Sequence, residues 1–143
     1  MPEQVKRVAM VSGGFDPLHV GHLDMIIGAA AYGRVVVALN SDAWLTRKKG
    51  RPFMEWEDRA RILAHIRDVS EVVSVDDADG TICDALRRVR PDYFCNGGDR
   101  TVPHPVEEAV CRELGIAQAF NVGGGKIRSS SDLVRAAIEM RVA

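Results

Sequence analysis

The sequence is poor in cysteine, in long apolar runs and in net charge. Its cysteines, Cys83, Cys95 and Cys111, are widely spaced and form no Cys-x-x-Cys pair. We therefore expect a reducing cytoplasm and neither disulfides nor a zinc site. No apolar stretch approaches the ~20 residues of a membrane-spanning helix, so we expect no membrane partner and no signal peptide. A formal net charge of −1 argues against nucleic acid as a partner.

Internal repeats, low-complexity tracts and linkers are also missing. The 143 residues suffice for one domain with a real core, so we expect a single domain spanning residues 1–143. Hydrophobic residues make up 46% and charged residues 27%, as in a globular protein of ordinary composition.

Short apolar runs alternate with segments of helical periodicity along the whole chain. The expected strands are 8–11, 35–39, 69–75, 92–95 and 116–120, and the expected helices lie near 23–30, 55–67, 81–89, 105–114 and from 129 onward. This alternation predicts an α/β fold, namely a Rossmann-like five-stranded parallel sheet with helices on both faces. An order of 3-2-1-4-5 would place the loops after the first and fourth strands at the switch point where ligands bind.

The most informative stretch is residues 12–22, between the first expected strand and helix. Gly13 and Gly14 allow close backbone approach to a ligand, and free N–H groups at a helix start attract phosphate. His19 and His22 are three residues apart, so both rings can lie on one helix face and donate to phosphate oxygens. Gly21 leaves room for a flat ring against the backbone. A partial metal site or a surface pair is the alternative.

Basic residues follow the second expected strand. Residues 40–52 are polar and carry four cations between Arg47 and Arg51. Such a run can be a solvated face, but beside a phosphate-binding loop it can close over a polyanion and neutralise a leaving pyrophosphate. Trp44 and Trp56 flank the cations and are expected to be packing anchors rather than base-stacking platforms.

Three further loops follow later strands. Asn96-Gly97-Gly98-Asp99 is a second suitable ligand loop. Residues 123–125 are three glycines, and Ser129, Ser130 and Ser131 then open the last helix, where they can cap it, bind phosphate, or do both. The acidic turn at 76–80 could hold a divalent ion, although the Gly-Thr that follows is typical of an ordinary loop and cap.

Phe15-Asp16 together with His19-Val20-Gly21-His22 resembles the His-x-Gly-His signature of the cytidylyltransferase-like nucleotidyltransferases. The resemblance implies an enzyme that transfers AMP or CMP from ATP or CTP to a phosphorylated small molecule and releases pyrophosphate. In that family the two histidines contact the triphosphate and stabilise the transition state. Mg²⁺ would be held mainly by the substrate phosphates, without a metal site of the protein.

The resemblance extends over nearly the whole chain and implies roles for further residues. Implied catalytic residues are His19, His22 and Lys48 or Lys49. Implied nucleotide-binding residues are Gly13, Gly14, Phe15, Gly21, Gly97, Asp99, Ser129, Ser130 and Ser131. Implied acceptor- or phosphate-binding residues are Asp16, Arg59, Lys126 and Arg128.

The acceptor is less well defined by these motifs. Gly97-Gly98-Asp99 is similar to the Gly-Gly-Asp of heptose-phosphate adenylyltransferases, which makes that type the first choice. Alternatives are a glycerol-3-phosphate-type cytidylyltransferase and a pantetheine-phosphate- or nicotinate-mononucleotide-type adenylyltransferase, toward which Pro17 and the three serines lean. Thr46 stands where the family often has lysine, which keeps a non-catalytic nucleotide sensor open. We expect a homodimer.

Overall fold

The structure is a computed structural model that describes residues 7–98, 102–125 and 129–142. Its elements in chain order are β1 (Val8–Gly13), α1 (Val20–Ala30), β2 (Arg34–Leu39), α2 (Asp42–Lys49), α3 (Trp56–Ala64), β3 (Val69–Ser74), α4 (Cys83–Val89), β4 (Tyr93–Cys95), α5 (Pro105–Leu114), β5 (Ala117–Ala119) and α6 (Ser130–Val142).

The five strands form one parallel sheet in the order β3-β2-β1-β4-β5, which confirms the predicted fold class and strand order. The central strand β1 pairs with β2 over its whole length, from Val8 beside Arg34 to Gly13 beside Leu39. Both strands are almost wholly apolar because helices cover the sheet on both faces.

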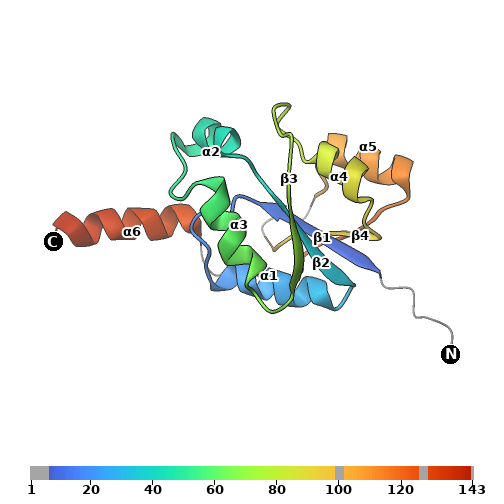
Figure 1. Cartoon of the computed structure of the whole chain (residues 1–143), viewed down its shortest axis with the longest axis horizontal. Helices are drawn as coiled ribbons and strands as arrows, with labels where there is room; N and C mark the ends of the chain where they lie inside the picture. Colours follow the sequence, from blue (N-terminus) through green and yellow to red (C-terminus); the bar gives the residue numbers. More distant parts are fainter. Residues whose placement is uncertain (1–6, 99–101, 126–128, 143) are drawn as a thin grey trace.

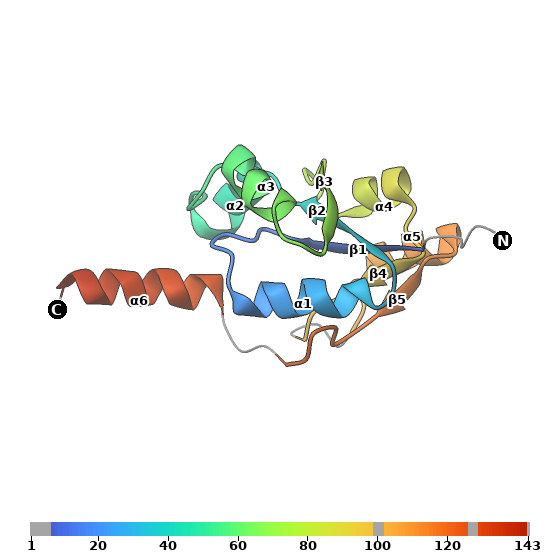
Figure 2. The ribbon, with the colours of Figure 1, turned by 60° about the horizontal axis from the view of Figure 1, so that its bottom comes forward.

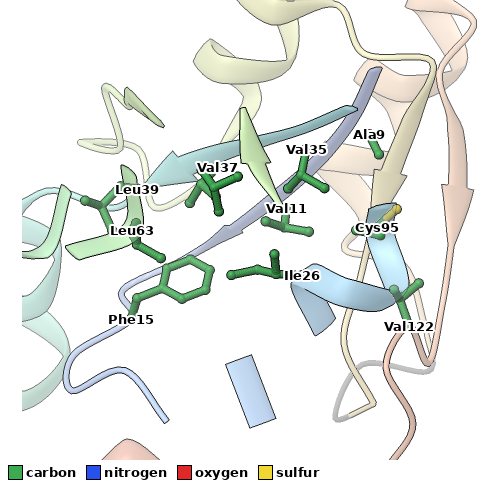
Figure 3. Close-up of a cluster of buried hydrophobic side chains, with 12 residues drawn as sticks. Ala9, Val11, Phe15, Ile26, Val35, Val37, Leu39, Leu63, Cys95 and Val122 are labelled. Atoms are coloured by element: carbon green, nitrogen blue, oxygen red, sulfur yellow. The ribbon is translucent and has the colours of Figure 1, made fainter. Parts of the chain in front are cut away.

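The two faces of the sheet bury separate hydrophobic clusters. On one face, Ile26 of α1 and Leu63 of α3 pack on Val11, Val37 and other strand residues (Figure 3). On the other, α4 and α5 cover alternate strand residues such as Met10 and Phe94. The alternation follows from the two-residue period of a strand, and it leaves the carboxyl ends of the strands for the loops.

One segment folds differently from its sequence-based interpretation. No helix was expected within the polar residues 40–52, but most of them form α2. Ser41 begins this helix by accepting a hydrogen bond from the N–H of Trp44 at 3.0 Å, and Gly50 ends it with a positive φ of 93°. Three of the four cations, Arg47, Lys48 and Lys49, therefore lie on a short helix that follows β2, and Arg51 lies just after its end.

The last helix, α6, extends away from the sheet and its covering helices (Figures 1 and 2). Its apolar side chains are correspondingly open, since Ile138 is 60% and Met140 78% exposed. Within the described ranges, no helix is both long and apolar enough to cross a membrane.

Candidate active site

Two histidines lie at the turn between β1 and α1, and backbone hydrogen bonds fix both of their rings. The N–H of Gly21 donates to Nδ1 of His19, and the N–H of His19 donates to Nδ1 of His22, each at 3.1 Å. The rings stack with their centroids 3.8 Å apart. Because each Nδ1 accepts, each neutral ring carries its proton on Nε2. The turn thus holds two adjacent Nε2–H donors.

Burial makes His22 a neutral donor. Loss of water contact, then electrostatic interaction with His19 and with Lys49, lowers the pKa of His22 from 6.5 to about 3. Phe15 is buried behind it, with ring centroids 4.8 Å apart. Phe15 thus supports the His22 ring, and its contact with the nucleotide stays a prediction.

A cavity of about 340 Å³ opens in front of these rings. The described site residues that line it come from four separate parts of the chain and are Gly14, Phe15, His19, Gly21, His22, Lys48, Gly97, Ser129, Ser130 and Ser131. The structure therefore places both imidazoles and the C-terminal serines at one cavity. Gly13 lines a neighbouring cavity instead.

The serines are joined directly to the histidine turn. The hydroxyl of Ser130 donates to the carbonyl of Pro17 at 2.8 Å, across 113 residues of sequence. Ser129 serves the helix end, because its hydroxyl accepts from the N–H of Asp132 at 3.3 Å. One serine therefore caps α6, while the next holds the start of α6 against the turn between β1 and α1.

Glycine is needed where two loops meet beside the cavity. A Cβ on Gly98 would overlap the carbonyl oxygen of Gly124. A Cβ on Gly123 would lie 2.6 Å from the backbone of Asp24, and Gly123 has a positive φ of 84°. The loop after β4 and the loop after β5 can approach each other and α1 this closely only without side chains.

The two lysines on α2 have different surroundings. The ammonium of Lys48 lies 4.7 Å from the centre of the Trp44 ring and borders the cavity. Lys49 instead donates to the backbone carbonyl of Asp16 at 2.8 Å, and it does not line that cavity. Of the two lysines, Lys48 is therefore the one that lies at this cavity.

Asp16 and Arg59 do not have the acceptor-binding positions that the resemblance implied. Each is only 1% exposed. The carboxylate of Asp16 accepts from the N–H groups of Phe53 and Met54 at 2.6 and 2.8 Å. Both carboxylate oxygens thus hold the segment before α3 in place. These hydrogen bonds offset the free-energy cost of burying the Asp16 charge.

The Arg59 guanidinium is similarly occupied. It donates to the carbonyls of Met54, Gly14 and Asn40, each at 2.9 Å, and to the Asp42 carboxylate at 2.6 Å. The acceptor-binding prediction for Arg59 is corrected accordingly. Its side chain links three parts of the chain, namely the turn between β1 and α1, the residue after β2, and the start of α2.

The acidic turn after β3 is also structural. Asp77 accepts from Ser41 and Asn40, and these hydrogen bonds outweigh the opposing effect of burial and lower its pKa. In the part of the chain that the structure describes, no three acidic, histidine or cysteine side chains are grouped to hold a metal ion.

Three predicted residues, Asp99, Lys126 and Arg128, lie outside the described residues.

The structure also adds residues that the sequence interpretation had not assigned to a site. Trp44 and Met25 border the first cavity, and Asn40, Asn96, His104 and Glu107 line the second. Asn40 and Asn96 directly follow β2 and β4, a position that could have identified them.

Comparison with known proteins agrees with this fold. The cytidylyltransferase-like family pattern matches residues 10–123, so the chain belongs to that family. It is 38% identical over 123 residues to the "bifunctional protein HldE" of Nitrobacter hamburgensis, covering 84% of this chain and 24% of that protein. The HldE protein of Methylobacillus flagellatus is 34% identical over 137 residues, covering 92% and 27%.

The chain thus spans about a quarter of the length of these curated relatives. Among solved structures, a lipopolysaccharide core biosynthesis protein from Thermoplasma volcanium has a TM-score of 0.70 at 20% identity, covering 81% of this chain and 94% of that one. At that identity the similarity supports the fold alone.

Proposed function

We propose that the chain transfers AMP from ATP to a sugar phosphate of the heptose-phosphate type and releases pyrophosphate. The observation that carries this is the convergence of the His19 and His22 Nε2–H donors with Ser129, Ser130 and Ser131 on one cavity. The Gly97-Gly98-Asp99 resemblance and the identity to the HldE proteins support the acceptor type. A cytidylyl donor or another phosphorylated acceptor fits the same chemistry.

The reaction needs no nucleophilic side chain. An oxygen of the acceptor phosphate attacks the α-phosphorus of the nucleotide in line, a new P–O bond forms, and the bond to the β-phosphate oxygen breaks. The electron pair leaves on pyrophosphate. The protein's contribution is to align the two phosphates and stabilise the charge that spreads over the phosphate oxygens.

The site residues divide this work. His19 and His22 donate to oxygens of the α- and β-phosphates from rings whose orientation the backbone already fixes, so little reorganisation accompanies the reaction. Lys48 neutralises the departing pyrophosphate, and Ser129, Ser130 and Ser131 bind the γ-phosphate of the nucleotide. Mg²⁺ would be held by phosphate oxygens and water, because both Nδ1 atoms are occupied and the Nε2 atoms are donors.

Pyrophosphate release tests this proposal. We expect release with ATP, or CTP, and at least one member of a panel of sugar and polyol phosphates. His22→Ala should lower turnover at least ~100-fold, the cost of losing one charge-stabilising donor. His65→Ala, an exposed histidine at the end of α3, is the matched control and should turn over like the parent. Tight nucleotide binding without any release would favour the sensor instead.

We also propose that the chain is a cytoplasmic homodimer. The open apolar side chains of α6, with Ile138 and Met140 prominent, and the neighbouring exposed Phe53 are supporting features. The three cysteines are buried thiols, which fits a reducing compartment. Light scattering of the parent and of Ile138→Lys tests the dimer: a monomeric parent would refute it.

A further inference from the structure

The two tryptophans that flank the cations have different surroundings. Trp56 packs against the hydrophobic cluster that contains Ile26 and Leu63, and its indole N–H donates to the carbonyl of Leu39 at 3.2 Å. Trp44 is half-buried, lies in neither hydrophobic cluster of the described residues, and lines both the first and the second cavity. The expected role of a packing anchor therefore fits Trp56, whereas Trp44 forms part of the cavity wall.

Packing of α2 on the turn between β1 and α1 places the Trp44 ring. The neighbouring Leu45 is only 1% exposed and anchors α2. A Cβ on Gly14 would lie 2.8 Å from Cδ2 of Leu45 and 3.5 Å from Cζ3 of Trp44, so both side chains reach the backbone of this turn. Glycine at position 14 allows this close approach. The indole ring therefore has a position that the fold defines.

Lys48 lies one helical turn after Trp44, on the same side of α2. Its ammonium is 4.7 Å from the centre of the indole ring. This distance lies within the ~6 Å range of a cation–π contact, for which indole is the best of the protein rings. A long lysine side chain loses rotamer entropy when its charge is fixed in one place, and the contact offsets part of that loss. The ring thus favours an ammonium position at the wall that both cavities share.

Two other cations of α2 have backbone partners away from these cavities. Arg47 and Lys49 each donate to a backbone carbonyl at 2.8 Å, and neither lines the first or the second cavity. Thr46, which stands where the family often has lysine, also lines neither. Among the described residues of α2, Lys48 is therefore the cation that the two cavities share.

We propose that Trp44 is a positioning residue, whose ring face holds the ammonium of Lys48 where pyrophosphate leaves. This inference rests on the proposed function, in which Lys48 neutralises the departing pyrophosphate. A cation–π contact acts on the charge as a whole rather than along one N–H direction, so it is compatible with a simultaneous contact to phosphate. Trp44 acts on the rate through Lys48 and does not itself contact the reacting atoms.

A double-mutant cycle in the full chain tests this role, with the rate of pyrophosphate release as the readout. Trp44→Leu should lower kcat about 5-fold, the effect of losing one cation–π contact, and Trp44→Phe, which keeps a ring face, should lower it less. Lys48→Met should lower kcat at least about 10-fold. In the Lys48→Met background, Trp44→Leu should change kcat less than about 2-fold, because no ammonium is left to position. The KM of the acceptor should stay within about 2-fold throughout.

Trp56→Phe is the matched control, because Trp56 lines neither cavity and the variant should keep kcat within about 2-fold of the parent. The same variant leaves Trp44 as the one tryptophan of the chain, so its fluorescence reports on this ring. Adding Lys48→Met should change the emission of Trp44 without any ligand, because a charge 4.7 Å from the ring is removed. This readout needs no activity, and a merely structural role of Trp44 would not produce it.

The outcomes separate this inference from the proposed function. If the parent releases pyrophosphate with no acceptor in the panel, the proposed function fails, whatever the emission of Trp44 shows. If the parent is active and Trp44→Leu lowers kcat equally with and without Lys48, the inference is overturned while the function stands, because Trp44 then acts through the fold. Unchanged kcat in Trp44→Leu, or unchanged emission on Lys48→Met, would overturn it as well. Trp44→Phe and the emission keep the test decisive if Trp44→Leu fails to fold.

Discussion

Replacing Arg59 by methionine separates a structural from a substrate-binding role for this residue. Methionine has a comparable length but cannot donate a hydrogen bond. Three backbone carbonyls, those of Gly14, Asn40 and Met54, would lose their donor. Leaving a buried polar group unsatisfied costs about 1–3 kcal/mol.

The three losses do not add fully, because removing a buried charge also removes its own desolvation cost. Asp42 is 40% exposed at its side chain and regains water, so it adds little. The expected loss of unfolding free energy is therefore about 3–5 kcal/mol, the range seen when one partner of a buried ion pair is removed. For a domain of this size that corresponds to roughly 10–15 °C in Tm.

Urea unfolding and calorimetry measure this loss directly, and Arg61→Met on the exposed side of the same helix is the control. Arg61→Met should stay within about 0.5 kcal/mol of the parent. If Arg59→Met unfolded within about 1 kcal/mol of the parent but raised the KM of a substrate, the buried-clamp account would be wrong. The substrate-binding role implied by the family resemblance would then be restored.

Two further perturbations follow from the site. The pKa of His22 is about 3 in the folded chain against 6.5 unfolded, so between these values the unfolded chain binds more protons and stability falls with acidification. Between pH 7 and pH 5 the unfolding free energy should fall by about 2 kcal/mol more in the parent than in His22→Gln. Urea unfolding at both pH values measures this difference. Equal falls in the two proteins would contradict the shifted pKa of His22. Gly98→Ala should force the loops after β4 and β5 apart and weaken ATP binding about 10-fold or more by calorimetry; unchanged affinity would show that their close approach is unimportant.

Much of the fold follows from local patterns. Apolar runs and helical periodicity predicted the parallel α/β fold class because each strand-to-helix unit is decided by nearby residues and the crossovers are right-handed. The helical state of residues 42–49 was missed because α2 has no clear apolar face, and only its Ser41 cap and Gly50 end indicate it. Such short helices depend on their caps and on tertiary contacts.

The site could be predicted where one continuous motif supplies it. His19 and His22 are such a case. Arg59 was assigned to the acceptor from the family resemblance. Its burial could not be predicted, because its partners Gly14 and Asn40 are 45 and 19 residues away. Nothing near Glu107 in the sequence predicts its burial, since its partner Ile82 is 25 residues away.

A crystal structure of the chain with a non-hydrolysable ATP analogue tests the central claim most directly. We predict that the triphosphate lies in the cavity between the turn that carries His19 and His22 and the serines 129–131. Phosphate oxygens should lie within about 3 Å of Nε2 of both histidines. A triphosphate bound elsewhere, with both imidazoles making no contact to it, would contradict the assignment of these rings to nucleotidyl transfer.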